Sequence, residues 1–248
     1  MSTSLRHQES PAPSRSAKTD RALSPAVWLI PVSLLIAAGC CLTIDLPVAR
    51  FFHAGHYPGF LRELVENTEP FGHGIGVVLL LTSLALVHRE QSLRYVTAGA
   101  IALGAGLCTN VIKFTYGRTR PRDLELAGAD FADTFTGWLP VLQDIGGSQS
   151  FPSGHTTVAW ALAVVLTQLF PTGRGLFFTL AVFVAYGRVQ CGAHYPSDVF
   201  AGAALGWTVA TLVLNYGPAR VRAIMSDPIS STSEPRLTIT PDSHSQAA

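Results

Sequence analysis

The sequence predicts an all-α membrane protein whose six transmembrane helices form a bundle. Only 13% of its 248 residues are charged and 48% are hydrophobic, with a mean hydropathy of +0.32. Soluble domains carry about 25% charged residues. The hydrophobic residues gather in six runs without Lys, Arg, Asp or Glu, and a helix that crosses a bilayer core needs about 17–25 such residues. A soluble helical bundle with buried core helices is the alternative interpretation.

The predicted spans differ in length. The fourth and fifth are shorter than a bilayer core requires, so we expect flanking polar residues to extend them while facing a cavity inside the protein. Small residues four positions apart favour close packing between helices. The spans are residues 26–44, 72–87, 95–112, 156–170, 176–186 and 199–216, and the small pairs are Gly72/Gly76, Ala100/Gly104 and Gly202/Gly206.

Polar segments flank and separate these spans. Residues 1–24 and 217–248 contain many Ser and Pro residues and predict disordered cytoplasmic tails. Residues 25–216 then form a single six-span domain. Two polar loops are expected, at residues 45–70 and 113–153. A cleaved signal peptide is an alternative for the first run, but the further runs that follow it favour a span.

Basic residues indicate the orientation of the bundle. Six spans place both termini on one side of the membrane. The N-terminal tail, the turns at residues 89–94 and 171–175 and the start of the C-terminal tail are basic, and loops rich in Lys and Arg stay in the cytoplasm. We therefore expect an integral protein of the inner or plasma membrane with cytoplasmic termini.

Composition also argues against several partners and cofactors. A net charge of +1 creates no global field that would recruit nucleic acid. The four cysteines lack the spacing of metal ligands and three of them lie inside hydrophobic runs, so neither a zinc site nor a disulfide framework is predicted. We expect no metal and no cofactor. The cysteines are Cys40, Cys41, Cys108 and Cys191.

Polar residues at the ends of four spans converge on one membrane face. Because successive spans cross in opposite directions, the third and fifth end on the extracytoplasmic side, and the fourth and sixth begin there. Basic groups, two histidines and one carboxylate therefore meet at that face. They are Lys113, Arg120, Ser153, Gly154, His155, Arg188, His194 and Asp198.

The three cations in this set suit an anion such as phosphate. Arg has a planar fork of donors that matches phosphate oxygens, and Lys acts as a point charge. Ser153 is a good N-cap, and exposed N–H groups at a helix start attract anions. Gly154 lets the backbone approach a ligand closely. For the neighbouring Arg118 and Arg122 we favour contact with lipid headgroups or snorkelling at the membrane surface.

A histidine and a carboxylate near the sixth span suggest nucleophilic catalysis. His194 and Asp198 are four positions apart and share a face if a helix begins near residue 195. An Asp can fix the tautomer of a neighbouring His and leave its other nitrogen free to attack. A capping Asp beside an interfacial His is the alternative. An ordinary helix cap does not need His155, so we expect this residue to take part in chemistry.

These residues resemble a known family signature. The segments Lys113-x6-Arg120-Pro121, Pro152-Ser153-Gly154-His155 and Arg188-x5-His194-x3-Asp198 look like the three linked motifs of the type-2 phosphatidic acid phosphatase superfamily. That family contains membrane lipid phosphate phosphatases, soluble acid phosphatases and vanadium haloperoxidases. The resemblance covers about residues 70–216, including the pattern of spans.

The resemblance implies a role for each motif residue. His194 is the nucleophile that forms a phosphohistidine, and Asp198 orients it. His155 protonates the leaving oxygen and then activates water. One position departs from the family: Gly187 stands where the family usually has Ser, so either one phosphate hydrogen bond is lost or a backbone N–H replaces it. The residues that hold the phosphoryl oxygens, without a metal, are Lys113, Arg120, Ser153, Gly154 and Arg188.

The sequence therefore predicts a membrane-embedded phosphatase that hydrolyses a lipid phosphomonoester or pyrophosphate. The candidate substrates are phosphatidic acid, phosphatidylglycerol phosphate, an isoprenyl pyrophosphate and the phosphate of a glycolipid. A vanadate-dependent haloperoxidase that uses the same anion pocket is the alternative enzyme, and the pattern of spans disfavours it. A non-catalytic lipid-binding or transport protein is a further alternative, in which both histidines would be dispensable.

Overall fold

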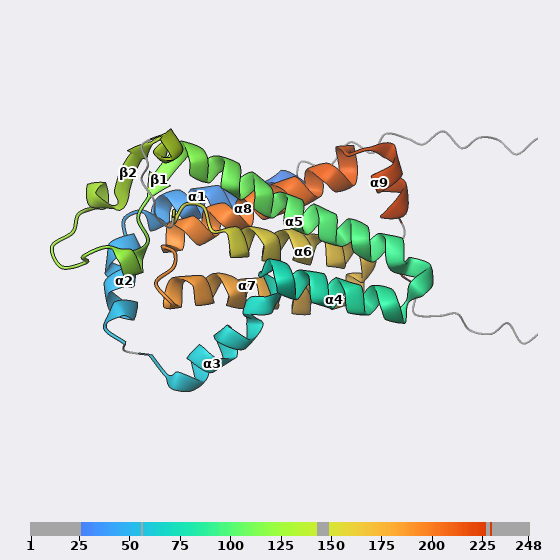
Figure 1. Ribbon diagram of the computed structural model, residues 1–248, viewed down its shortest axis with the longest axis horizontal. Coiled ribbons are helices and arrows are strands. Elements are labelled where there is room, and N and C mark those ends of the chain that lie inside the picture. Colours follow the sequence, from blue (N-terminus) through green and yellow to red (C-terminus); the bar gives the residue numbers. More distant parts are fainter. Residues whose placement is uncertain (1–25, 56, 143–148, 227–228, 230–248) are drawn as a thin grey trace, which may run out of the picture.

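The computed structural model describes residues 26–55, 57–142, 149–226 and 229. Its long helices lie roughly side by side (Figure 1). Helix α6 packs against α5, α7 and α8, while α1 packs on α8 and α4 on α5. These helices are α1 (Ala26–Cys41), α4 (Gly74–Val87), α5 (Ser92–Thr115), α6 (Gly154–Leu169), α7 (Arg174–Gln190) and α8 (Pro196–Tyr216).

Each predicted hydrophobic run corresponds to one of these helices, but the number of spans is only partly confirmed. By length and composition, two helical segments of the described chain can cross a membrane, at Arg89–Thr115 and Pro196–Tyr216. The number rises to four if each bent pair is one span. The pairs are Val27–Cys41 with Asp45–His53, bent by 72°, and Gly59–Phe71 with Gly74–Val87, bent by 65°. Helix α6 is apolar but shorter.

The distribution of apolar side chains explains why α6 lies inside the bundle. Residues on nearly every side of α6 are buried, from Thr156 to Leu169. The outer helices instead present large apolar side chains to their surroundings: Leu29, Ile75 and Leu107 are each about two-thirds exposed. An apolar outer surface on helices that satisfy their own backbone hydrogen bonds is typical of a protein surrounded by lipid.

The prediction of a polar loop at residues 45–70 is wrong, because this segment is mostly helical. It forms helices α2 (Asp45–His53) and α3 (Gly59–Thr68) and the short 3-10 helix η1 (Glu69–Phe71). Both longer helices are amphipathic, with Ala49 and Val65 buried and most charged residues facing outward. A narrow apolar stripe is sufficient for a helix that packs against a single neighbour. Because most residues of this segment are polar, the helical spacing of its few apolar residues was not recognised in the sequence.

The second predicted loop, between α5 and α6, contains a small antiparallel hairpin. Strand β1 (Tyr116–Arg118) pairs with β2 (Phe135–Trp138), with a register shift between Gly117 and Arg118. The hairpin covers the end of the bundle where α5 ends (Figure 1). Three 3-10 helices complete the described part of the loop: η3 (Pro121–Asp123), η4 (Phe131–Thr134) and η5 (Pro140–Leu142).

The C-terminal tail is ordered over a longer stretch than the sequence indicated. Helix α9 (Ala219–Ile224) follows α8 directly, and Met225 is almost fully buried. The N–H of Ile229 donates to the carbonyl of Leu169 over 2.8 Å. The expectation of a disordered tail is therefore wrong for residues 217–226, and its part at residues 230–248 lies outside the described residues. The predicted N-terminal tail at residues 1–24 lies outside the described residues.

Glycines on α8 bring its backbone against α6. A Cβ added to Gly206 would lie 2.3 Å from the carbonyl oxygen of Thr157, and one added to Gly202 would lie 2.6 Å from the carbonyl oxygen of Ser153. The predicted close packing at this pair is confirmed. Gly104 on α5 differs, because a Cβ there would have no neighbour within 4 Å.

We expect Gly206→Ala to destabilise the bundle by about 1–3 kcal/mol, because the new methyl group overpacks the α6–α8 contact. Gly104→Ala is the matched control. It adds the same methyl group in open space and should be neutral or stabilise by up to about 1 kcal/mol through helix propensity. Thermal unfolding of both purified variants in detergent measures the difference. Equal midpoints would show that α6 and α8 are not in close contact there.

Candidate active site

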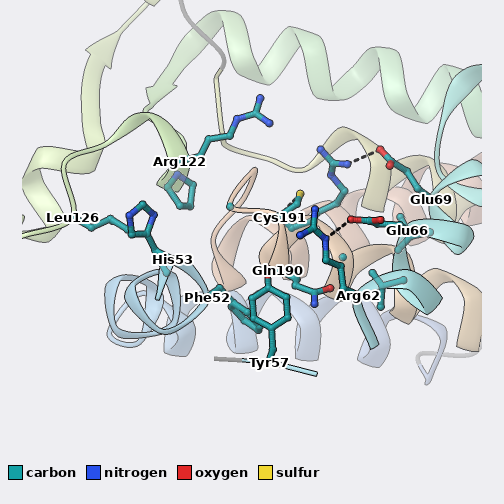
Figure 2. A pocket seen from close by; sticks show the side chains of 17 residues that line it. Phe52, His53, Tyr57, Arg62, Glu66, Glu69, Arg122, Leu126, Gln190 and Cys191 are labelled. Atoms are coloured by element: carbon teal, nitrogen blue, oxygen red, sulfur yellow. Dashed lines mark hydrogen bonds and ion pairs between the residues drawn. The ribbon is translucent and has the colours of Figure 1, made fainter. Parts of the chain in front are cut away.

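The polar ends of four helices meet at one end of the bundle. The C-terminal ends of α5 and α7 and the N-terminal ends of α6 and α8 lie at the end that carries α2 and the hairpin (Figure 1). A cavity of about 560 Å³ opens there beside Arg188, between α2, α3 and the last turn of α7 (Figure 2). Of the residues predicted from the sequence, Arg188 lines this cavity.

The structure brings the predicted site residues together. The charge of Lys113 interacts with those of Arg120, Arg188 and Asp198. The ring of His155 lies within the field of Arg188, Lys113 and His194. Three cations and two imidazoles therefore share a single small region, although they come from three helices and two loops.

His194 is held from one side by a backbone carbonyl. Its ring is 2% exposed, and Nδ1 lies 2.6 Å from the carbonyl oxygen of Ser150. Because a carbonyl only accepts hydrogen bonds, Nδ1 carries the proton and Nε2 carries the free lone pair. Burial lowers the pKa of His194, and the nearby carboxylate of Asp198 opposes this shift. The neutral imidazole that a nucleophile requires is thus favoured.

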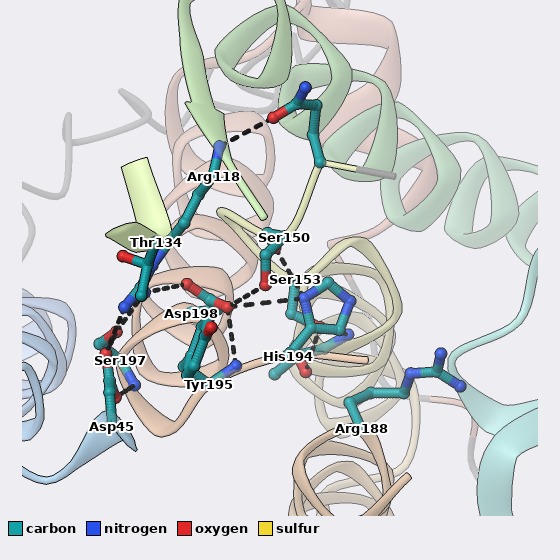
Figure 3. Close-up of polar contacts among 12 residues, drawn as sticks. Asp45, Arg118, Thr134, Ser150, Ser153, Arg188, His194, Tyr195, Ser197 and Asp198 are labelled. Carbon is teal, nitrogen blue, oxygen red and sulfur yellow. Dashed lines mark hydrogen bonds and ion pairs between the residues drawn. The ribbon is translucent and has the colours of Figure 1, made fainter. Parts of the chain in front are cut away.

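Asp198 reaches His194 less directly than the sequence suggested. The distance from Nδ1 of His194 to the nearer carboxylate oxygen is 3.8 Å, too long for a hydrogen bond. The same oxygen accepts from the hydroxyl of Ser150 and, over 2.8 Å, from the N–H of Tyr195. Asp198 therefore positions the backbone of Ser150, which in turn holds the imidazole (Figure 3).

The prediction for Arg118 is wrong, because its side chain is buried and not at the membrane surface. It is 1% exposed and forms ion pairs with two carboxylates, with Asp198 over 2.6 Å and with Asp45 over 2.7 Å. The hydroxyl of Ser197 accepts from the same guanidinium, and the ring of Tyr195 lies against it at 4.1 Å. Figure 3 shows Arg118 lying between Asp45 and Asp198. Arg122, in contrast, is about half exposed.

The guanidinium of Arg118 remains protonated in this environment. Burial alone would lower its pKa, but the charge of Asp198 and the hydrogen bond and charge of Asp45 outweigh burial and raise the pKa above its ordinary value. Buried carboxylates cost several kcal/mol unless a cation and hydrogen bonds compensate them. Arg118 therefore joins α2 to the start of α8 through two compensated carboxylates.

The first turn of α6 presents free N–H groups to the site. Ser153 is the N-cap, and its hydroxyl oxygen accepts from the hydroxyl of Thr156 over 2.9 Å. Its own N–H donates to the carbonyl of Asp198 over 3.1 Å. The N–H groups of Gly154 and His155 belong to the first turn, where a helix offers no internal acceptor. They are suited to an anion.

A carboxylate from the first half of the chain sits on the cation cluster. The guanidinium of Arg188 donates to Glu69 over 2.6 Å, and the same carboxylate oxygen lies 3.4 Å from Nε2 of His155. Glu69 belongs to η1, between α3 and α4. An anionic oxygen thus already contacts two groups that the motifs associate with phosphate.

The structure explains why Gly187 stands where the family usually has Ser. A Cβ at Gly187 would lie 2.3 Å from a methyl group of Val65 on α3. Gly187 also lies inside α7, so its N–H belongs to the helical ladder and cannot replace the missing hydroxyl. The glycine allows α3 to pack tightly against α7, at the loss of one side-chain donor.

The motifs and their arrangement agree with the comparison with known sequences, in which residues 94–222 match the PAP2 superfamily. The chain belongs to the PAP2 superfamily. It is 38% identical over 181 residues to a lipid A 1-phosphatase of Rhizobium etli, covering 66% of this chain and 73% of that protein.

Two further proteins show the range of the similarity. A decaprenylphosphoryl-5-phosphoribose phosphatase of Mycobacterium tuberculosis is 35% identical over 169 residues, covering 67% of this chain and 85% of that protein. Among solved structures, a transmembrane PAP2 type phosphatidylglycerolphosphate phosphatase from Bacillus subtilis is similar with a TM-score of 0.49 and 20% identity, covering 75% of this chain and 95% of that one.

Sequence reasoning missed Asp45, Ser150 and Glu69. Asp45 and Glu69 lie outside the segment that matches the PAP2 superfamily, and each follows or precedes a hydrophobic run, where an acidic residue is ordinary. Ser150 stands next to the second motif but carries no family signal of its own. Within the described residues, no group of three or more His, Cys, Asp or Glu side chains could hold a metal ion.

We expect Arg118→Met to destabilise the protein by about 3–5 kcal/mol, because Asp45 and Asp198 would remain buried without their shared cation. Arg122→Met is the matched control. Its side chain is about half exposed and 3.7 Å from Asp123, so the loss should stay below about 1 kcal/mol. Chemical unfolding in detergent compares the two. Similar losses would show that the buried ion pairs do not hold the site together.

Proposed function

We propose that this PAP2 protein is a membrane-embedded phosphatase that hydrolyses a lipid phosphomonoester or pyrophosphate through a phosphohistidine. The observation that carries the proposal is the state of His194. Its Nδ1 donates a hydrogen bond to a carbonyl 2.6 Å away, so Nε2 is a neutral nucleophile near the charges of Lys113 and Arg188. A nucleophile with a fixed tautomer and preorganised positive charge is what phosphoryl transfer requires.

In the proposed first step, Nε2 of His194 attacks phosphorus and the bond to the leaving oxygen breaks. His155 gives its proton to that oxygen, and the enzyme keeps the phosphoryl group as a phosphohistidine. In the second step, the now neutral His155 takes a proton from water, and the oxygen of that water attacks phosphorus. The phosphohistidine bond breaks, phosphate leaves, and both imidazoles return to their starting states. Asp198 and Ser150 orient His194 throughout.

The phosphoryl oxygens are held by side chains and by the start of α6. Lys113, Arg120 and Arg188 supply positive charge, and the Nε atoms of both arginines are buried without a hydrogen-bond partner among the described residues. Ser153 can donate its hydroxyl hydrogen, because its oxygen acts as acceptor within the cap. Gly154 contributes an N–H at a helix start. In this proposal, phosphate competes with Glu69 for Arg188.

The relatives support a lipid as the carrier of the phosphate. They include the lipid A and decaprenylphosphoryl phosphatases named above and a lipid phosphate phosphatase of Arabidopsis thaliana. Phosphate release from phosphatidic acid, phosphatidylglycerol phosphate, an isoprenyl pyrophosphate and a phosphorylated glycolipid tests the reaction class. Release from none of them would overturn the proposal.

We also propose six spans, with residues 25–216 as one domain, cytoplasmic termini and an extracytoplasmic site. Helices α1, α4, α5, α6, α7 and α8 alternate in direction, and the basic turns lie at the end of the bundle opposite the site. Basic loops remain in the cytoplasm. Exposed Trp138 on the site's side suits the depth of lipid headgroups. A lipid can then present its phosphate while its chains remain in the bilayer.

Substitution of His194 and of His155 should impair the reaction in different ways. We expect His194→Ala to abolish the phosphoenzyme, and His155→Ala to slow the reaction by about 10²–10⁴-fold through loss of general acid catalysis. A good leaving group such as p-nitrophenolate should recover part of the first step in His155→Ala but not in His194→Ala. Trapping of labelled phosphoenzyme and rates with dodecyl phosphate and p-nitrophenyl phosphate measure this. His88→Ala, an exposed histidine at the other end of α4, is the control, and full activity of both site variants would refute their roles.

Thiol labelling should reveal the orientation. We expect a membrane-impermeant maleimide to label Asp130→Cys in intact cells, in a variant whose four native cysteines are replaced by serine. Thr172→Cys, in the turn between α6 and α7, should react only after permeabilisation. Both positions are exposed, so accessibility to the reagent reports the side of the membrane. The opposite pattern would place the site in the cytoplasm.

A further inference from the structure

The cavity beside Arg188 adjoins the cation cluster. A phosphomonoester bound by Lys113, Arg120 and Arg188 has a single ester oxygen, through which its carrier extends away from the cations. The volume of about 560 Å³ lies within the range of about 300–1,000 Å³ that is typical of small-molecule sites. Arg188 belongs both to the cation cluster and to the cavity wall.

We infer that this cavity binds a neutral, hydroxyl-rich carbohydrate group that carries the scissile phosphate, an inference that rests on the proposed phosphatase function. Of the four candidate substrates, a cavity that binds carbohydrate favours the phosphorylated glycolipid. The hydrogen-bonding groups, aromatic rings and charges of the cavity wall favour a sugar over a second phosphate, an acyl chain or a bare glycerol backbone.

Hydrogen-bond donors and acceptors line the cavity together. Arg62, Arg122 and the amide of Gln190 can donate, while Glu66 and Glu69 can accept. A sugar hydroxyl both donates and accepts, so a ring with several hydroxyls matches such a mixed wall. An acyl chain can neither donate nor accept hydrogen bonds, so it would use none of these groups.

Gln190 provides a separate indication of a polar ligand. Its side chain is 6% exposed, yet its amide nitrogen has no hydrogen-bond partner among the described residues. It lies on the cavity wall beside Tyr57 and Phe52 (Figure 2). A buried amide donor of a cavity-lining residue, without a protein partner among the described residues, can gain one by turning toward a ligand oxygen.

Two aromatic rings complete the same side of the cavity. Phe52 and Tyr57 are in edge contact with their centroids 5.7 Å apart. Aromatic side chains offer apolar faces, and Tyr adds a hydroxyl. A sugar ring has an apolar C–H face and a polar rim, so it can contact the rings and Gln190 at once.

The charges of the wall disfavour a second anionic group. Arg62 is paired with Glu66 over 2.7 Å, and Arg188 with Glu69 over 2.6 Å. A second phosphate would have to approach both carboxylates, and like charges repel at such distances. The nearly balanced charge instead suits an uncharged polar group.

One side of the wall, formed by α2 and α3, lies outside the segment that matches the family, whereas Arg188 and Gln190 on the other side lie within it. Helices α2 and α3 precede residue 94, where the match begins. Gly187 lets Val65 of α3 approach α7 closely, so the departure from the family motif and the position of this wall are linked. Arg188 joins this wall to the groups assigned to the reaction.

Two substrates with the same alkyl chain test the inference. The purified full-length protein in detergent is assayed for phosphate release from dodecyl β-glucopyranoside 6-phosphate and from dodecyl phosphate. We expect kcat/KM to be about tenfold or more higher for the glucoside phosphate. Gln190→Leu and Tyr57→Ala should each lower this ratio several-fold, because they remove a donor and an aromatic face. Tyr216→Ala, an exposed tyrosine at the end of α8, is the matched control and should leave the ratio unchanged.

The outcomes separate this inference from the proposed function. Equal kcat/KM for both substrates, or hydrolysis of dodecyl phosphate alone, would overturn the carbohydrate site and leave the phosphatase standing. A ratio that neither Gln190→Leu nor Tyr57→Ala lowers would also overturn it. Tyr57 is only partly buried, so its variant provides the answer if Gln190→Leu fails to fold. Hydrolysis of neither substrate nor of the lipid panel would overturn both proposals.

Discussion

The arrangement of the site depends on one buried guanidinium. Arg118 forms ion pairs with Asp45 at the start of α2 and with Asp198 in the first turn of α8. Both carboxylates have no exposed area, and in such surroundings an unpaired charge is very unfavourable. The effect extends to His194, because Asp198 also binds Ser150, and the carbonyl of Ser150 holds the imidazole. Arg118, which is not among the residues that we assign to phosphate binding, thus determines where the proposed nucleophile His194 lies.

Close contacts between helix backbones position the other half of the site. Glycines on two neighbours lie against the first turn of α6: a Cβ at Gly72 or at Gly202 would lie 2.6 Å from the carbonyl oxygens of His155 and Ser153, respectively. Such contacts allow little movement, because interiors are densely packed. The free N–H groups at the start of α6 and the ring of His155 are therefore held at a defined distance from the cations of α5 and α7.

Two parts of the chain meet at the cavity beside Arg188. Residues assigned to phosphoryl transfer lie within the segment that matches the PAP2 superfamily, whereas α2, α3 and Glu69 lie before it. Glu69 nevertheless contacts Arg188, and Val65 occupies the space that a side chain at residue 187 would need. The wall that we assign to the substrate carrier and the cations that we assign to its phosphate therefore share direct contacts.

The sequence alone determined the helices of the bundle and the list of candidate residues, because long uncharged runs and short motifs are local features. It also placed Lys113, His155 and His194 at one end, since that follows from counting crossings. Only the tertiary structure decided the environment of each group. The segment with Asp45 and Glu69 looked like a polar loop, because its apolar stripe is narrow, and Arg118 looked like a surface residue. Burial and ion pairing join residues far apart in the chain, as in the pair of Arg118 with Asp45, and no local pattern records such a contact.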